Sequence, residues 1–226
     1  AALWLLGAVA VLPEPAMGLG GLRHAVRVGK LKGLCAAGPY RWLRFLPPGL
    51  WGKPVFSPSQ AQAGSVQATP GKGTDLALLS FTSGSTGAPK AIPRSHDFLL
   101  AQQDAVAPLL ASDREEIDLV AFPVFVLINL AAGRTSVLPN WPMRQMDKVT
   151  PEALTTWITR HGATRLLLPP SLCETLAKTA MPGSVTTLFT GGGPVFPDLT
   201  ERLLQKAPEL RLVSVYGSTE AEPIAE

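Results

Sequence analysis

The residues best suited to chemistry lie in one short stretch, TSGSTGAPK at positions 82–90. The stretch holds four hydroxyl side chains, two glycines and one lysine: Thr82, Ser83, Ser85, Thr86, Gly84, Gly87 and Lys90. Backbone N–H groups of a glycine-containing loop, hydroxyl donors and one cation are groups that hold a polyphosphate. The stretch therefore predicts a phosphate-binding loop.

This loop differs from the nucleotide-binding P-loop, in which the lysine directly follows the second glycine and a helix begins at once. Here Lys90 stands three residues after Gly87, with Pro89 between them. Pro89 has no N–H and disfavours a helical conformation at Ala88, so we expect the chain to be extended from Lys90 onward. A strand–loop–strand arrangement is predicted, with a P-loop kinase or ATPase as a competing hypothesis.

Two further glycine motifs occur later in the chain, FTGGGPV at 189–195 and VYGSTEAE at 215–222. Like the first loop, each continues a short apolar run that is typical of a buried strand. In an α/β sheet the carboxyl ends of the parallel strands share one edge, and ligands bind there. The three turns are therefore expected to meet at one pocket. The alternative is that the glycines only form turns.

Together, the three motifs resemble those of the adenylate-forming superfamily of acyl-CoA synthetases, peptide-synthetase adenylation domains and luciferases. FTSGSTGAPK is similar to its phosphate-binding motif, FTGGGPV to its small-residue motif and VYGSTEAE to its Tyr-Gly-x-Thr-Glu motif. They occur in the family's order, and the resemblance covers nearly the whole chain. The resemblance implies an α/β fold with mostly parallel sheets flanked by helices. It also implies a fragment of the large N-terminal domain, without the C-terminal domain.

The resemblance assigns cofactor-binding roles to residues of all three motifs: Thr82, Ser83, Gly84, Ser85, Thr86, Gly87, Lys90, Gly191, Gly192, Gly193, Tyr216, Gly217 and Thr219. The first loop would hold the β- and γ-phosphates of ATP, and the three consecutive glycines would let adenine approach the backbone closely. Tyr216 would pack against the adenine ring, or alternatively be a core aromatic residue.

Three residues are implied to be catalytic: Lys90, Thr219 and Glu220. Thr219 would contact the α-phosphate. Glu220 would bind Mg²⁺, a cation that prefers oxygen ligands, or alternatively be a solvated acid at a helix start. In the implied reaction a carboxylate attacks the α-phosphorus of ATP and pyrophosphate leaves, which gives an acyl-adenylate. Transfer to CoA or a carrier protein, or closure to a β-lactone, would follow. The alternative is an inactive nucleotide-binding module, and the fragment alone is expected to be inactive.

The stretch FPVFVLINLAAG at 122–133 departs from the pattern of many acyl-CoA synthetases, because Val126 stands where they carry a His or an aromatic residue. Its surroundings resemble the branch that contains the β-lactone synthetases of olefin biosynthesis and related fatty-acid ligases. Residues 124–133 are then expected to line the pocket for a fatty or 3-hydroxy fatty acid, since no charged side chain interrupts them. A plain core segment is the alternative.

The composition limits the possible classes of protein. Twenty Lys and Arg residues against 17 Asp and Glu residues give a net charge of +3, and the basic residues are interpreted as scattered, without a nucleic-acid footprint. The two cysteines, Cys35 and Cys173, are expected to be buried thiols in a reducing, cytoplasmic compartment. The apolar opening AALWLLGAVAVL is too short to span a bilayer and is expected to form a buried helix end and a core strand.

Strands and helices are expected to alternate in the second half of the chain, as in an α/β sheet. The domain plan is a first α/β subdomain at 1–46, a Pro/Gly/Ser-rich linker at 47–74 and a nucleotide-binding region at 75–226. The expected strands are 75–81, 117–125, 163–168, 185–190 and 210–216. The expected helix starts are the Ser95 cap, Thr150 with Pro151, a capping box of Ser171 and Glu174, and Pro197.

Overall fold

The computed structural model describes residues 2–13, 17–57, 67–82, 89–141, 143–218 and 221–225. The chain divides into two compact units, Ala1–Leu100 and Ala101–Glu226. Helix α3 (His96–Val106) begins in the first unit and ends in the second. No helix among the described residues combines the length and the apolar character needed to cross a membrane.

The first unit contains a three-stranded sheet in the order β1-β4-β5. Strand β4 runs parallel to β1 and antiparallel to β5, while β2 and β3 form a separate parallel pair. Ala25 packs against Leu79 and Phe81 in a small core. The elements of this unit are α1 (Ala2–Leu5), β1 (Ala10–Leu12), α2 (Gly18–Gly29), β2 (Leu34–Cys35), η2 (Gly38–Phe45), η3 (Pro48–Leu50), β3 (Val55–Phe56), β4 (Leu76–Thr82) and β5 (Lys90–Ser95).

Strands β4 and β5 flank the expected phosphate-binding loop. Thr82 lies opposite Lys90 in the antiparallel register, and Lys90 is the first residue of β5. Ser95 Oγ accepts a hydrogen bond from the backbone N–H of Phe98 at 3.1 Å and so caps α3. The predicted strand–loop–strand arrangement and the predicted helix start after Ser95 are therefore confirmed.

The second unit is built on a six-stranded sheet in the order β11-β10-β9-β8-β6-β7. All neighbouring strands are parallel except β10 and β11, which are antiparallel. The fold class expected from the sequence is confirmed by this sheet. The elements are β6 (Ile117–Val120), α4 (Pro123–Ala131), β7 (Thr135–Val137), η5 (Met143–Lys148), α5 (Pro151–His161), β8 (Arg165–Leu168), α6 (Pro170–Leu176), β9 (Thr187–Gly191), α7 (Pro197–Lys206), β10 (Arg211–Ser218) and β11 (Ala221–Ala225).

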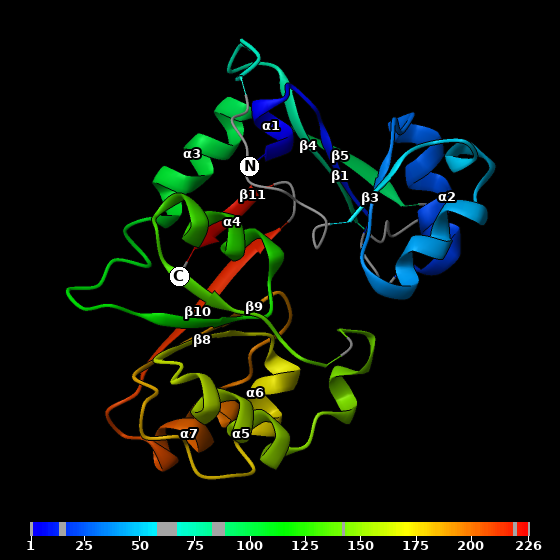
Figure 1. The fold of residues 1–226 in the computed structure, drawn as a ribbon. Helices are drawn as coiled ribbons and strands as arrows, with labels where there is room; N and C mark the ends of the chain where they lie inside the picture. The colour runs from blue at the N-terminus through cyan, green and yellow to red at the C-terminus, as the bar shows by residue number, and fades with distance from the viewer. Residues whose placement is uncertain are drawn as a thin grey trace. The chain divides into compact units, whose positions relative to one another are not determined.

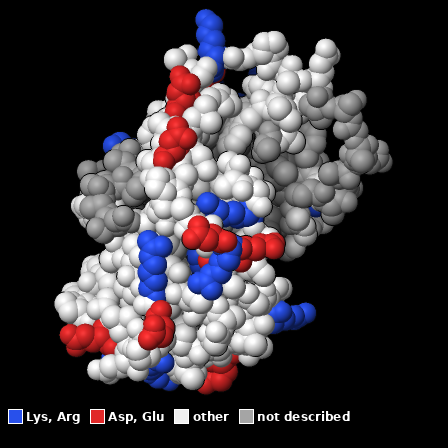
Figure 2. Space-filling model, turned by 90° about the vertical axis from the view of Figure 1, so that its left-hand side faces the viewer, with Lys and Arg blue, Asp and Glu red and all other residues white. Residues whose placement is uncertain are grey.

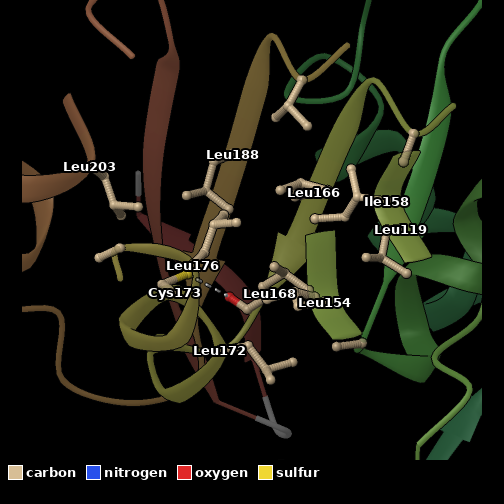
Figure 3. Close-up of a cluster of buried hydrophobic side chains, with 14 of the residues drawn as sticks. Leu119, Leu154, Ile158, Leu166, Leu168, Leu172, Cys173, Leu176, Leu188 and Leu203 are labelled. Carbon is tan, nitrogen blue, oxygen red and sulfur yellow. Dashed lines mark hydrogen bonds between the residues drawn. The ribbon is translucent and has the colours of Figure 1, made fainter. Parts of the chain in front are cut away.

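Helices cover both faces of this sheet, with α5, α6 and α7 on one face and α4 on the other (Figure 1). The strand pleat sends alternate leucines of β8 into two cores. Leu166 and Leu168 pack with residues of α5, α6 and α7, as Figure 3 shows, whereas Leu167 packs on the opposite face with Ile128 of α4. Because both faces are covered, strand β8 is buried at every residue.

The predicted starts of α5 and α7 are confirmed. Thr150 Oγ1 accepts a hydrogen bond from the Ala153 N–H at 3.2 Å, and Gly162 ends the same helix at φ 58°. Pro197 is the first residue of α7. In each helix a proline occupies the first turn, where an N–H would have no helical partner.

Two expectations about the second unit are wrong. The strand expected at 117–125 ends at Val120, and α4 begins at Pro123, because proline suits the first helical turn and cannot donate to a strand ladder. The capping box of Ser171 and Glu174 does not form, because α6 already begins at Pro170 and its N-cap residue makes no side-chain hydrogen bond.

Two expectations about the first unit are also corrected. Cys35 is exposed, because its strand pairs only with the short β3, while Cys173 is buried as expected. The short elements η3 and β3 lie within the loop or linker expected at 47–74, and the domain plan stays a prediction. The opening does form a helix and a strand, but α1 contains no buried residue.

Candidate functional site

A cavity lies on the α4 side of the large sheet, at the carboxyl ends of β9 and β10. Its walls come from the end of α3, from α4 and from three strands. Apolar side chains and glycine backbone form most of them: Gln102, Val106, Phe122, Val124, Phe125, Ile128, Leu167, Phe189, Thr190, Gly191, Gly192, Val215 and Gly217. No lining residue that the structure describes carries a charge.

Two of the three sequence motifs contribute to this cavity. Gly191 and Gly192 come from the motif at 189–195, and Gly217 comes from the motif at 215–222. β9 and β10 are parallel neighbours, with Gly191 opposite Val215, so their carboxyl ends meet at one edge. The expectation that the glycine turns meet at one pocket is thus confirmed for these two motifs.

The glycines at 191 and 192 are required by the fold itself. A Cβ atom at Gly191 would collide with the backbone carbonyl oxygen of Val215 on the neighbouring strand. Gly192 has φ +73°, a left-handed conformation that favours glycine, and a Cβ there would lie 3.2 Å from the ring of Phe122. These two glycines therefore let β9 pass close to β10 and turn beside the cavity.

Gly193 and Tyr216 are placed differently. A Cβ at Gly193 would approach Pro170 no closer than 3.8 Å, so packing within the described protein does not require glycine there. Tyr216 is 68% exposed, which excludes the alternative that it is a core residue. Strand alternation turns Tyr216 away from the face of Val213 and Val215 and toward the face on which Leu212 packs, but Tyr216 itself is not part of that core.

The remaining predicted site residues lie in or beside the first loop and after β10. Thr82 ends β4 and Lys90 begins β5 with an exposed side chain. The other residues lie outside the described part of the chain: Ser83, Gly84, Ser85, Thr86, Gly87, Thr219 and Glu220. The expected Mg²⁺ ligand is among them. Within the described ranges, no group of three or more His, Cys, Asp or Glu side chains is placed to hold a metal.

Two polar residues line the cavity, and the sequence analysis singled out neither. Gln102 is 6% exposed and lies one helical turn before Val106, which is also buried and also lines the cavity. A glutamine four residues before Val106 gives no signal of burial in the sequence, so only the structure identifies it. Thr190 receives a hydrogen bond from Cys173 Sγ at 3.4 Å on the opposite face of the sheet.

The thiol of Cys173, which lies behind this wall of the cavity, is unreactive. Burial raises the pKa of Cys173 to about 11, although the hydrogen bond with Thr190 opposes the shift. The thiolate is therefore scarce at neutral pH. Cys173 supports the wall of the cavity as a small apolar residue, and it is no candidate nucleophile.

A buried amide anchors helix α4. This helix and its N-cap residue, Phe122, supply four of the residues that line the cavity. Asn129 Nδ2 donates hydrogen bonds to Asp118 Oδ2 at 2.8 Å and to Ser136 Oγ at 3.0 Å. Asn129 and Asp118 are both fully buried. Since Asn129 and Ile128 are adjacent on α4, this anchor fixes the orientation of the helix that faces the cavity.

Comparison with known proteins agrees with this geometry. The family described as AMP-binding enzyme matches residues 2–225. An olefin β-lactone synthetase from Stenotrophomonas maltophilia (strain K279a) is 34% identical over 155 residues, 68% of this chain and 28% of that protein. A 4-coumarate–CoA ligase 3 from Arabidopsis thaliana is 34% identical over 169 residues, 67% of this chain and 29% of that protein.

A solved structure of a long-chain-fatty-acid-CoA ligase from Archaeoglobus fulgidus matches with a TM-score of 0.74 and 25% identity. The match covers 98% of this chain and 50% of that one. Because the family match covers almost every residue, the chain belongs to the AMP-binding enzyme family. It spans less than a third of the length of the two curated relatives.

Proposed function

We propose that this chain forms the nucleotide-binding and acid-binding part of an enzyme that uses ATP to convert a carboxylic acid into an acyl-adenylate, with release of pyrophosphate. The observation that carries the proposal is the position of the apolar cavity. It opens beside Gly191, Gly192 and Gly217, which belong to the two motifs that we expect to bind the nucleotide. An acid held there would lie next to the nucleotide.

The lining of the cavity supports an acid with a hydrocarbon chain, of the fatty or 3-hydroxy fatty type. Phe122, Val124 and Phe125 from the α4 side and Val106 from α3 offer only apolar surface. Burying a hydrocarbon there is favourable by about 25 cal/mol per Å².

The nucleotide would be held by the motif residues. Tyr216 is exposed and available to stack on adenine, and Lys90 stands at the start of β5 with the phosphate-binding loop just before it. Glu220 offers the hard oxygen ligand that Mg²⁺ prefers. Charge that develops on the phosphates would be neutralised by Lys90 and the loop donors. The residues that line the cavity would align the carboxylate.

The fate of the adenylate is proposed to be either thioester formation with CoA or a carrier protein, or closure to a β-lactone. The similarity to a protein named olefin β-lactone synthetase supports lactone closure. The similarity to a 4-coumarate–CoA ligase supports a thioester. A product that forms from a 3-hydroxy acid and ATP without added CoA would favour the lactone.

The test is ATP–pyrophosphate exchange by the complete protein with Mg²⁺ and a panel of fatty, 3-hydroxy fatty and aromatic acids. Exchange that depends on an added acid is the expected result, and the best acid identifies the substrate class. ATP binding without exchange on any acid would instead establish the second candidate, a nucleotide-binding module without catalysis.

Lys90→Ala tests the phosphate-binding role of this lysine, and Lys178→Ala is the control for loss of an exposed lysine. We expect Lys90→Ala to lower exchange by about 100-fold, the size seen when one charge-stabilising donor is removed. The control should exchange normally. Unchanged exchange and unchanged ATP affinity in Lys90→Ala would contradict the phosphate-binding assignment.

A further inference from the structure

The positive charge of the chain is concentrated in one segment and is not scattered as its composition suggested. Residues 15–74 contain no Asp or Glu and eight Lys or Arg residues: Arg23, Arg27, Lys30, Lys32, Arg41, Arg44, Lys53 and Lys72. Outside this segment, acidic residues outnumber basic residues by 17 to 12. Acidic and basic side chains are interspersed on the face of the molecule that Figure 2 shows. The segment 15–74 is therefore electrostatically distinct from the rest of the chain.

The same segment exposes large aromatic side chains from η2 and the turn after η3. Tyr40 is 68% exposed, Trp42 70%, Phe45 52% and Trp51 62%. Trp42, Phe45 and Trp51 are linked by contacts of their own, and we call these three residues the aromatic patch. Large side chains of this kind are normally buried for most of their area, and a group of them on one surface marks an interaction site.

The aromatic patch is held outward by its own contacts. The rings of Trp42 and Phe45 lie 5.7 Å apart between centroids. Trp51 Nε1 donates a hydrogen bond to the Phe45 carbonyl oxygen at 3.0 Å, which ties the turn after η3 to the end of η2. The exposed rings therefore have defined positions on the surface.

Basic side chains lie beside two of these rings, Phe45 and Trp51. The guanidinium of Arg44 lies over the ring of Phe45 at 4.5 Å from its centroid, and Arg41 and Lys53 are exposed. A hollow in the surface is lined by Arg44, Phe45, Leu50, Trp51, Gly52 and Lys53. It combines two cations with two aromatic rings, a setting in which a phosphate headgroup would meet both charge and apolar surface.

We propose that this face docks on an anionic lipid surface, with the aromatic patch at the level of the headgroups. Trp and Tyr side chains favour the interface between headgroups and acyl chains, and clustered Lys and Arg side chains are attracted to anionic lipids. The exposed aliphatic side chain of Leu46, 45% exposed, extends the apolar area of the same turn. Nucleic acid also binds basic and aromatic surfaces, but its bases stack on aromatic rings and not on an aliphatic side chain such as that of Leu46.

The docking surface goes beyond the proposed acid activation and is tested separately from it. The complete protein is sedimented with vesicles of phosphatidylcholine alone and with vesicles of equal parts phosphatidylcholine and phosphatidylglycerol. We expect binding to the anionic vesicles, weaker binding as salt is raised, and little binding to the neutral vesicles.

Matched variants separate the aromatic and charge contributions. Trp42→Ser/Trp51→Ser is expected to bind anionic vesicles about tenfold more weakly, and Phe196→Ser, which removes another exposed ring, is expected to bind normally. Arg41→Glu/Arg44→Glu is expected to abolish the salt-dependent binding, while the control Lys178→Glu/Lys206→Glu keeps it. Exchange activity with a short, water-soluble acid should be the same in all of them.

Several results would overturn the proposal. The first is absence of binding to anionic vesicles, and the second is equal binding to them by Trp42→Ser/Trp51→Ser and Phe196→Ser. The third is that Trp42→Ser/Trp51→Ser loses binding to single-stranded DNA while it keeps its binding to lipid. A lower melting temperature or a changed oligomeric state in Trp42→Ser/Trp51→Ser would show that protein covers the patch, and that also overturns it.

Discussion

Asp118 and Arg165 form a buried, two-pronged ion pair between neighbouring strands of the large sheet. Arg165 Nε donates to Asp118 Oδ1 at 2.7 Å and Nη2 donates to Oδ2 at 2.8 Å. The two side chains are 0% and 3% exposed. Arg165 Nη1 also donates to the Leu110 carbonyl at 2.8 Å, and Asp118 holds the Asn129 amide of α4. One ion pair thus connects β6, β8, α4 and the segment after α3, and of these elements β8 and α4 line the cavity.

Removal of one partner of this pair is predicted to destabilise the protein strongly. Asp118→Ala should cost about 3–5 kcal/mol in the free energy of unfolding, because Arg165 would stay buried without a counter-ion. Urea denaturation of the complete protein measures the change. The control is Glu174→Ala, which breaks a half-exposed ion pair with Arg202 and should change stability far less.

The double variant Asp118→Leu/Arg165→Met is expected to recover part of that loss, since apolar residues of similar volume leave no unpaired charge. A double variant that is no more stable than Asp118→Ala would show that the pair acts mainly through its geometry.

The glycines at 191 and 193 are predicted to respond differently to the same substitution. Gly191→Ala should destabilise the protein by about 1–3 kcal/mol, because its Cβ would press on the Val215 carbonyl and separate β9 from β10. Gly193→Ala has room for its methyl group and should keep the stability of the parent. Thermal unfolding and ATP titration of both variants provide the measurement.

Weaker ATP binding by Gly193→Ala, at unchanged stability, is the expected sign that adenine approaches this backbone. Normal ATP binding by a stable Gly193→Ala would remove Gly193 from the nucleotide site.

Filling the cavity is predicted to change the choice of acid. Val124→Trp places a large ring among the lining residues and should shift exchange toward shorter acids, with a loss of about 10- to 200-fold per excluded group on long ones. Val126→Trp is the matched control, because Val126 packs on the same core but does not line the cavity. Equal acid profiles for the two variants would place the acid elsewhere.

A pH effect is predicted at Glu116, outside the cavity. Burial by itself raises the pKa of this carboxyl, but hydrogen bonds from Thr164 and Ser112 oppose it, as do the positive charges of Arg165 and Arg114, and the pKa is lowered overall. A lowered folded-state pKa stabilises the fold above the unfolded-state pKa, and this stability is lost as pH falls through the folded-state pKa.

Ser112→Ala removes a 2.7 Å hydrogen bond to Glu116 and should therefore raise its folded-state pKa, so that acid unfolding begins at a higher pH. Circular dichroism during an acid titration measures the midpoint. Ser184→Ala, whose hydroxyl bonds only the Ala163 carbonyl among the described contacts, should leave that midpoint in place.

Local patterns in the sequence were sufficient for several of the elements and for the family. The Pro151 and Pro197 helix starts, the Ser95 cap and the extended chain at Lys90 depend on neighbours within a few residues, and each appears in the structure. Local patterns failed at 117–125, where a continuous apolar run hides a change from strand to helix at Pro123.

The sequence by itself determined the α/β class, the strand–loop–strand form of the stretch around TSGSTGAPK and the membership of the chain in its family. Only the tertiary structure decided that Gln102 meets Val215 across a cavity, that Asp118 and Arg165 are buried together and that Trp42 faces outward. Backbone preferences and turns act between near neighbours and are written locally. Burial and contact between residues tens of positions apart depend on how the sheet and helices pack, and no short stretch of sequence contains that information.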